Sequence, residues 1–478
     1  MDENNVVIRY LKELGYNPRT DYYSNIELWK CWYRNYVKKF HEYHDQNGEL
    51  RKTHRLGMAK RICEDWSSIL YTERDEVVCQ NENNQKYVDE IFKQTKFNSK
   101  LSENIENAFW SGTVGTITRI KNAKIKGNKI IADDKTKYTF VSVTADQIVP
   151  LRVEDGEIID VAFVSKTTIQ NENAYYIEIH ELKENGYVIK NKYINEKGEE
   201  QENNKVPDEY SLNSDVKLFN LLSPRIVNNI KNNNGLGISV YANSIDQLEM
   251  CDTAYNNFYM DYYLGGKKVF YNKKLTKYGT RTFTDDKTGE TVTQEYPVYP
   301  DDITKQQFQV VGDEFENANE DTLIHEYNPD LREADNEAGT NYALSMLAFK
   351  CGLGKDYYRF EHGQVVTATQ ALIDNRDLTG NAKKHRSAVN DYIVGIVKSV
   401  LLLGKELFGQ NLELKDEIQL IDKDGFLISE EELKEQYLSE ISQGLRQPWE
   451  YRVKFMGEDE ETAKKMIADE EIDENSEE

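Results

Sequence analysis

Histidines are the first side chains to consider for metal binding or acid–base chemistry, and the chain has seven. Only His41 and His44 lie close together, in the sequence His-Glu-Tyr-His. A zinc-binding HExxH helix places its histidines at i and i+4 on one face, and this pair is one residue too close. We therefore interpret both as polar residues at a helix end and predict no metal site.

The motifs of several enzyme classes are also missing from the sequence. It contains neither a GxxxxGK[ST] phosphate loop nor a GxSxG nucleophile turn. Gly235 and Gly237 form an isolated glycine pair after a polar stretch, which we interpret as the approach to a helix. The 84 Asp and Glu residues are spread widely, as on a solvated acidic surface. The sequence therefore predicts a protein that is not an enzyme, with no catalytic residue and no cofactor.

The charge balance narrows the possible partners. With 60 Lys and Arg against 84 Asp and Glu, the net charge is −24. Gripping DNA by phosphate neutralisation needs clustered basic residues, so this balance argues against a repressor or a nucleic-acid coat protein. The 31 Tyr, 17 Phe and 5 Trp are too many for a disordered chain. Since only 38% of residues are hydrophobic, we expect other subunits to cover part of the surface.

The cysteines and the apolar segments indicate the compartment. Five widely spaced cysteines without a CxxC pair are typical of a reduced, intracellular protein without a zinc site. The first residues contain no apolar core of a signal peptide. The longest apolar run, Tyr392–Leu403, contains Lys398 and is too short to span a bilayer. We expect no contact with a membrane.

The first half of the 478 residues predicts a mixed domain. Apolar spacing indicates helices over 28–40, 58–70 and 86–110. Six strands are predicted at 113–120, 128–132, 137–143, 157–166, 174–183 and 186–194. Asp155-Gly156 and Asn185-Gly186 are typical of hairpin turns. The polar stretch 195–215 is predicted to be a mobile loop.

The second half predicts long helices around a small β insert. One helix is expected from about Ser239 to Leu264 and a second from about Leu331 to Cys351, with strands between Lys267 and Glu326. Further helices are expected over 369–380, with a continuation to Arg386 left open, and over 391–409, before a helical, acidic tail. The fold class is therefore α+β. A β module at the end of two antiparallel helices buries little surface in a monomer, so the tyrosines of these helices suggest packing against copies of the chain.

Several segments in this order resemble portal proteins of tailed bacteriophages, of the siphophage type from Gram-positive hosts. Gly235–Tyr241, followed by Ser244–Leu248 and Asp252, is similar to the family's approach to its first stem helix. Tyr327–Arg332 resembles the segment that returns from the clip. Cys351–Leu353 and Thr367–Gln370 resemble the Gly-Leu loop and the TATE-type motif.

The ends of the chain extend the resemblance. An aromatic pattern near the N-terminus is similar to the family's W..WY…FH.Y pattern, with Trp29, Trp32, Tyr33, Phe40, His41 and Tyr43. Gly444-Leu445 and the Glu-rich segment Glu458–Ala463 resemble the crown-side helices. Each match alone is weak, but the ordered set covers most of the chain and is fairly specific.

The resemblance implies a portal-type fold with a mixed wing domain, long stem helices, a small β-rich clip and a helical crown. The implied regions are a wing (1–235), a first stem helix (236–265), a clip (266–327), a second stem helix (328–352), a tunnel loop (353–369), long wing and crown-side helices (370–409), and a crown with an acidic tail (410–478).

The resemblance also implies a function and its partners. The chain would form a ring, usually a dodecamer, at one capsid vertex of the virion, after assembly in the host cytoplasm. Double-stranded DNA would pass through its channel during packaging and ejection. The ring would dock the terminase large subunit, scaffolding and major capsid proteins, and a head-completion adaptor. An acidic balance suits a passage that holds DNA weakly.

Site residues follow from the same resemblance. A DNA-facing tunnel loop would contain Arg359, His362, Gly363, Gln364, Val365 and Val366, with Lys350 and Lys355 as basic channel residues. The stem interface between subunits would contain Tyr241, Tyr255, Phe258, Tyr259 and Tyr262. Docking at the clip would use Tyr278, Arg281, Phe283 and Tyr296.

Two alternatives remain open from the sequence. The first is another ring-forming head or tail protein of a phage, which would share the acidity and aromatic content but not the helix, β insert, helix order. The second is an enzyme whose chemistry has no motif in the sequence. Particle size in solution separates them, since a ring with a central hole favours the portal and a compact monomer with hydrolytic activity favours the enzyme.

Overall fold

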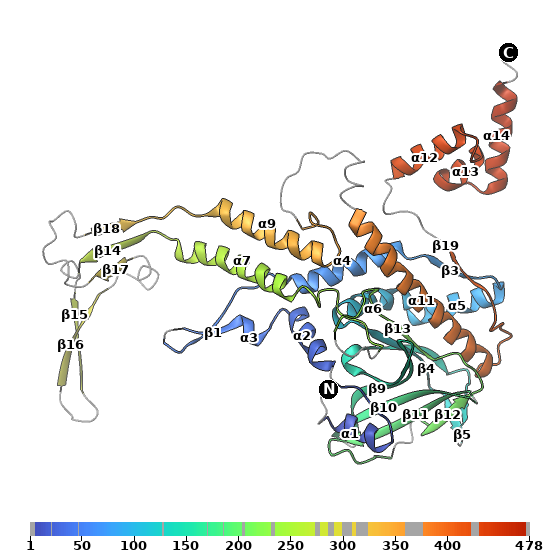
Figure 1. The fold of residues 1–478 in the computed structure, drawn as a ribbon, viewed down its shortest axis with the longest axis horizontal. Coiled ribbons are helices and arrows are strands. Elements are labelled where there is room, and N and C mark those ends of the chain that lie inside the picture. Colours follow the sequence, from blue (N-terminus) through green and yellow to red (C-terminus); the bar gives the residue numbers. More distant parts are fainter. Residues whose placement is uncertain are drawn as a thin grey trace.

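The computed structural model describes residues 5–20, 22–45, 47–126, 129–169, 171–184, 186–202, 206–230, 235–272, 278–284, 291–298, 308–311, 324–358, 376–421 and 430–474 (Figure 1). It is a mixed α+β structure with several small sheets, which confirms the predicted fold class. Figure 1 shows a mixed body from which a pair of helices projects, with strands at the far end of the pair.

The body contains most of the N-terminal half and one long helix from the C-terminal half. Its helices are α1 (Val6–Glu13), α2 (Tyr23–Tyr33), α3 (Lys38–His41), α4 (Met58–Glu73), α5 (Glu82–Thr95), α6 (Phe97–Ser111) and α11 (Arg376–Glu406). The range 86–110, predicted as one helix, is therefore two. Lys96 separates them with a left-handed backbone, φ 53°, which helical spacing of apolar residues cannot reveal.

Two antiparallel sheets make up most of the β structure of the body. The five-stranded sheet has the order β12 (Glu209–Leu212), β11 (Gly186–Asn195), β10 (Glu172–Lys183), β9 (Glu157–Ile169), β8 (Ile148–Glu154). The three-stranded sheet has the order β13 (Phe219–Leu222), β4 (Val114–Lys121), β7 (Lys137–Thr144). A 3₁₀ turn, Ala145–Gln147, leads from β7 to β8.

Three two-stranded ribbons complete the body. They pair β1 (Glu42–His44) with β2 (Leu50–Lys52), β5 (Lys124–Lys126) with β6 (Lys129–Ile131), and β3 (Glu76–Cys79) with β19 (Ile418–Ile421). The last pair ties the segment after α11 back to the N-terminal half of the chain.

The predicted strands of the body are confirmed, and one turn shows why. Asp155 and Gly156 connect β8 to β9 with positive φ values of 49° and 84°, the backbone that an Asp-Gly hairpin turn adopts. The predicted loop 195–215 is corrected in part, because Glu209–Leu212 pairs with β11 as the edge strand β12. The segment Glu209–Leu212 has the polar composition of a loop because an edge strand exposes one side to water.

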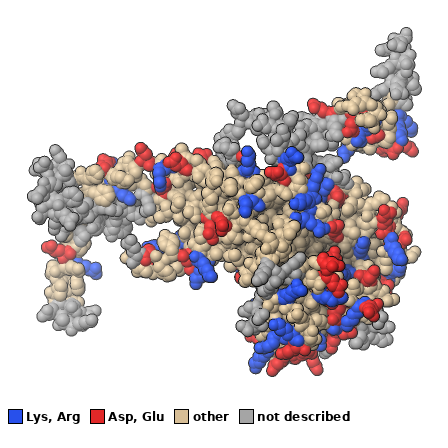
Figure 2. Space-filling view, in the orientation of Figure 1, with Lys and Arg blue, Asp and Glu red and all other residues tan. Residues whose placement is uncertain are grey.

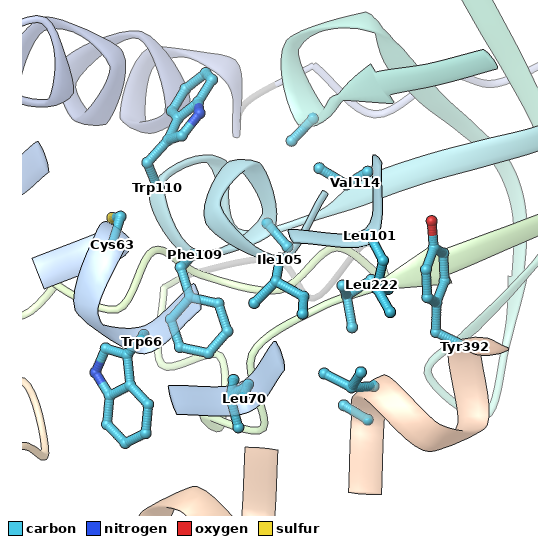
Figure 3. Packing of buried hydrophobic residues seen from close by; sticks show 14 of the residues in the cluster. Cys63, Trp66, Leu70, Leu101, Ile105, Phe109, Trp110, Val114, Leu222 and Tyr392 are labelled. Atoms are coloured by element: carbon cyan, nitrogen blue, oxygen red, sulfur yellow. The ribbon is translucent and has the colours of Figure 1, made fainter. Parts of the chain in front are cut away.

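One large hydrophobic core fills the body. In Figure 3, Trp66 and Leu70 of α4, Ile105 and Phe109 of α6, and Tyr392 of α11 lie in the same cluster. The rings of Trp66 and Phe109 have centroids 5.7 Å apart. A separate, smaller core forms where α1 covers a face of the five-stranded sheet with Val7, Ile8, Tyr10 and Leu11.

Helix α11 corrects the prediction of two helices, 369–380 with a continuation to Arg386 left open, and 391–409. Its described part is one 31-residue helix. Residues 359–375, which include most of the predicted tunnel loop, lie outside the described residues. Gly395 in the middle of this helix allows close packing, since a Cβ there would lie 2.0 Å from Asn220 Oδ1. Among the described helices, α11 is the one long and apolar enough to cross a membrane, but 72% of its most apolar window is buried within the chain, as in a core helix.

The projection consists of two antiparallel helices and the β insert. Helix α7 (Ile245–Leu264) runs outward and α9 (Glu333–Lys350) returns. The insert contains β14 (Lys268–Asn272), β15 (Tyr278–Thr284), β16 (Thr291–Pro297), β17 (Phe308–Val311) and β18 (Ile324–Tyr327). Its sheets have the orders β17-β14-β18 and β15-β16. The predicted helix, β insert, helix order is confirmed, although α7 begins six residues later than expected.

The C-terminal part is helical, as predicted. It contains α12 (Glu430–Ser442), α13 (Pro448–Tyr451), a π-helical turn (Arg452–Met456) and α14 (Glu460–Glu474). Arg452 forms an ion pair with Glu458 at 2.9 Å, and Arg446 lies over the Tyr437 ring. The acidic residues of the tail begin at Glu458, two residues before α14.

Candidate oligomer and docking surfaces

The base of α7 is held in the body by a buried polar contact. Asp252 accepts hydrogen bonds from the Leu56 amide at 2.7 Å and from His41 Nε2 at 2.9 Å. The Val37 amide donates to His41 Nδ1 at 2.8 Å, so the ring proton is on Nε2 and points at Asp252. His41 is fully buried, whereas the sequence predicted only a polar residue at a helix end.

The inner end of α9 is held in the same way. Trp66 of α4 donates from its indole nitrogen to the Cys351 carbonyl at 3.1 Å. Leu344 and Leu347 of α9 are buried, as are Leu248 and Cys251 of α7. Both helices are therefore fixed to the body at their inner ends by close packing and satisfied polar groups.

The outer halves of the two helices have few buried residues. Asp261 accepts from Arg332 at 2.5 Å and from the Asn336 amide at 2.6 Å, and Tyr262 donates to Glu333 at 2.7 Å. The hydrogen bonds from Arg332 and Asn336 lower the pKa of Asp261. These contacts join the helices through side chains that are exposed (Arg332, Tyr262 and Glu333) or half-buried (Asp261 and Asn336), and such contacts contribute little to global stability.

The five predicted stem residues differ in how far the structure buries them. Tyr241 precedes α7, is fully buried, and donates its hydroxyl to the Trp29 carbonyl at 2.8 Å. It cannot contact a second copy, so this part of the prediction is wrong. The helical spacing of apolar residues includes Tyr241, although this residue lies before the helix and packs in the core of the body. Tyr255 and Phe258 are half-buried, while Tyr259 and Tyr262 are exposed by 41% and 48%.

Three further aromatic side chains on the same helix pair are exposed and were not predicted. Tyr263 at the end of α7 is exposed by 55%, and Tyr342 and Phe349 on α9 are exposed by 60% and 56%. The α9 pair was detectable, because residues seven apart lie on one face of a helix. The exposed aromatic surface is therefore larger than predicted and extends over both helices.

The four predicted clip residues lie on the ribbon of β15 and β16. Register pairs Gly279 with Tyr296 and Phe283 with Val292, so Arg281, Phe283 and Tyr296 share one face of the ribbon. Tyr278 lies on the opposite face. Tyr278, Phe283 and Tyr296 are each exposed by more than two fifths. The Tyr296 ring lies over Gly279, where a Cβ would be 3.0 Å from the ring.

The predicted tunnel-loop residues Arg359, His362, Gly363, Gln364, Val365 and Val366 lie outside the described residues. The segments on both sides of them are described. Lys350 and Lys355 are exposed on one side, and Arg376, Lys383 and Lys384 are exposed at the start of α11 on the other. Figure 2 shows basic side chains gathered near the start of α11, although the chain as a whole is strongly acidic.

The described part of the chain contains no group of three His, Cys, Asp or Glu side chains placed to hold a metal ion. The buried side chains of His41 and Asp252 form a hydrogen bond between elements and do not form part of such a group. No protein-family model matches this sequence, and no curated protein matches it either.

Proposed function

We propose that the chain is a portal protein, the ring-forming subunit of the channel at one capsid vertex of a tailed phage. One observation carries this proposal. An antiparallel helix pair, fixed in an α/β body at its inner end, carries a β insert at its outer end and exposes aromatic side chains along its length (Figure 1). Exposed apolar surface of this kind is typical of a protein–protein interface.

Each part of the molecule has a place in the proposed ring. The helices α7 and α9 are the stem, the body is the wing, the insert is the clip, and the helices after residue 430 belong to the crown. The face of the ribbon with Arg281, Phe283 and Tyr296 is the surface for the terminase large subunit and, later, for the head-completion adaptor. The scaffolding and major capsid proteins contact the ring during head assembly.

The charges support a channel with weak affinity for DNA. Lys350, Lys355, Arg376, Lys383 and Lys384 flank the segment assigned to the tunnel loop. Five cations within a chain of net charge −24 give local attraction to phosphate without general adhesion. DNA can then move past the loop instead of being captured.

The shape of purified protein in solution tests the proposal. Light scattering is expected to show a large closed oligomer, and negative-stain images are expected to show rings with a central hole. A strict monomer at high protein concentration and moderate salt would contradict the proposal. Rings that bind no terminase large subunit would favour another ring-forming head or tail protein.

A further inference from the structure

A short arm of the body lies beside the stem. We define the arm as residues 38–55, which contain α3 and the β1–β2 ribbon. It is attached to α7, since the His54 amide donates to Asn256 Oδ1 at 3.0 Å and the His54 ring lies 3.6 Å from the Tyr259 ring. In Figure 1 the arm and α9 lie on opposite sides of α7.

The arm exposes apolar and basic side chains. Tyr43 and Leu50 are exposed by 48% and 49%. They lie on opposite faces of the ribbon, because Tyr43 pairs with Arg51 and His44 pairs with Leu50. Lys38, Lys39, Arg51 and Lys52 are also exposed. A two-stranded ribbon of this size has little stability of its own, so a partner that covers it would stabilise it.

The outer face of α9 has the complementary composition. Its positions toward α7 include Leu344 and Leu347, which are buried. Tyr342 and Phe349 lie on the far side of the helix and are exposed. Asp335 lies on this far side, seven residues before Tyr342, and is exposed, whereas Glu333 and Glu337 lie on the side of Leu347 and Leu344. Figure 2 shows acidic side chains along this edge of the projection.

We propose that the arm of one copy packs against the outer face of α9 of the next copy. If the Tyr43 face of the ribbon makes the contact, Tyr43 covers Tyr342 and Phe349 and Arg51 faces Asp335. If the Leu50 face makes it, Leu50 and Lys52 take these places. This inference rests on the proposed ring.

In each copy, α7 lies between the arm and α9, so the arm surface and the outer α9 surface face in opposite directions. Every copy therefore has one arm surface and one α9 surface. Such a head-to-tail contact repeats around a ring and leaves neither surface uncovered when the ring closes. Opposite charges at the edge of an apolar contact fix its register and direct the encounter.

Cysteine cross-linking in assembled rings tests the contact. Two double variants, Leu50→Cys with Tyr342→Cys and Tyr43→Cys with Tyr342→Cys, place thiols on either face of the arm. Mild oxidation is expected to give a ladder of covalent multimers on non-reducing gels with at least one of them. Tyr342→Cys alone and Leu50→Cys with Met250→Cys, which puts the second thiol on α7, are the controls and are expected to give no ladder.

The outcomes separate this inference from the proposed function. Rings in the micrographs without a ladder from either double variant overturn the contact and leave the ring intact as a proposal. All variants are made in a Cys31→Ser chain, because Cys31 is a half-exposed native thiol that could itself cross-link. Covalent dimers from Tyr342→Cys alone in this chain overturn the contact as well, because they indicate that two α9 faces meet. Failure of the wild-type chain to form rings counts against the proposed function itself.

A charge exchange provides a second readout that needs no new thiol. Arg51→Glu with Lys52→Glu is expected to raise the protein concentration needed for ring assembly several-fold at low salt. Adding Asp335→Lys to the same chain is expected to restore assembly, because the charges across the contact are again opposite. Assembly of the first variant at the wild-type concentration would overturn the contact.

Discussion

The body and the projection of this molecule bury their aromatic side chains to very different extents. In the body, Trp29 and Trp66 are almost completely buried. In the outer projection, Tyr263, Tyr342 and Phe349 are each more than half exposed. The body has the composition of a unit that folds alone, whereas the projection presents side chains that other chains can cover.

The hydrogen bonds and ion pairs of polar side chains also differ between the body and the projection. In the body, the Tyr392 hydroxyl bonds to Thr116 at 2.6 Å and accepts from Asn104 at 2.9 Å, all within the core. Burial raises the pKa of Glu178, but the Arg119 charge and His180 outweigh burial and lower it to about 2. The outer projection instead relies on exposed contacts such as Asp261 with Arg332. Loss of a polar partner should therefore cost far more stability in the body.

The largest expected effect is loss of an aromatic side chain from the body. Trp66→Ala removes a buried indole and its hydrogen bond to Cys351, and is expected to lower the free energy of unfolding by roughly 3–5 kcal/mol. Tyr342→Ala in the projection is the matched control, with an expected change within about 0.5 kcal/mol in unassembled protein. Urea denaturation measures both, and equal losses would refute the division between body and projection.

The next effect is a loss of stability in mild acid that originates in the body. Burial, reinforced by the nearby Lys384 charge, lowers the pKa of His385 to about 4. Because the unfolded histidine has a pKa of about 6.5, its contribution is complete above that pH and is lost as the pH falls toward 4. The loss is expected to reach ~3 kcal/mol at most by pH 4.

His385→Asn tests this assignment. His385 Nδ1 accepts from the Arg225 amide at 3.0 Å, and an asparagine oxygen can replace that acceptor without titrating. Unfolding free energies at pH 7 and pH 5 are expected to differ less in the variant than in wild type. An unchanged difference would assign the acid sensitivity to other groups.

Local patterns in the sequence predicted the elements well. Turn residues at Asp155-Gly156 set the β8–β9 register, and apolar spacing located most of α7 and α9. The unity of α11 was not predicted, because the polar residues that follow Gly380 are typical of a helix end. In the structure, Ala388 and Val389 of the predicted break are buried, so tertiary packing continues the helix through it.

The candidate surfaces were predicted only in part, because tertiary neighbours also decide which residues are exposed. Tyr241 and Tyr259 have the same spacing and the same residue type, but one lies in the core and the other is exposed. Spacing places a residue on a helix face but does not say which neighbour covers that face. Tyr342 and Phe349 were missed although their spacing alone could have marked them.

Removal of the ribbon is expected to affect binding but hardly affect folding. Replacing Thr280–Gln294 with a short Gly-Ser linker leaves β14 and β18 in place and removes side chains that are exposed in β15 and β16. The urea midpoint of the body is therefore expected to stay unchanged, while binding of the terminase large subunit is lost. A pull-down with the purified motor protein measures binding, and retained binding would move the docking surface elsewhere.

The smallest expected effect is local and concerns the contact between the outer ends of α7 and α9. Asp261→Asn removes the charge that Arg332 faces at 2.5 Å. Amide exchange is expected to become faster in 255–264 and 333–340 of unassembled protein, because these turns open without unfolding the body. The urea midpoint should not move, and raised salt should give wild-type protein the same faster exchange by screening the exposed pair.

An equivalent exposed pair in the arm provides the control for this local effect. Asp45→Asn removes the partner of Arg51, whose Nε lies 2.9 Å from Asp45, and is expected to speed exchange in the arm alone. In assembled rings the effect of Asp261→Asn should shrink, since neighbouring copies would then cover the outer helices. If Asp261→Asn instead lowers the urea midpoint of the body, the projection and the body unfold together, and their separation into two regions of different stability is wrong.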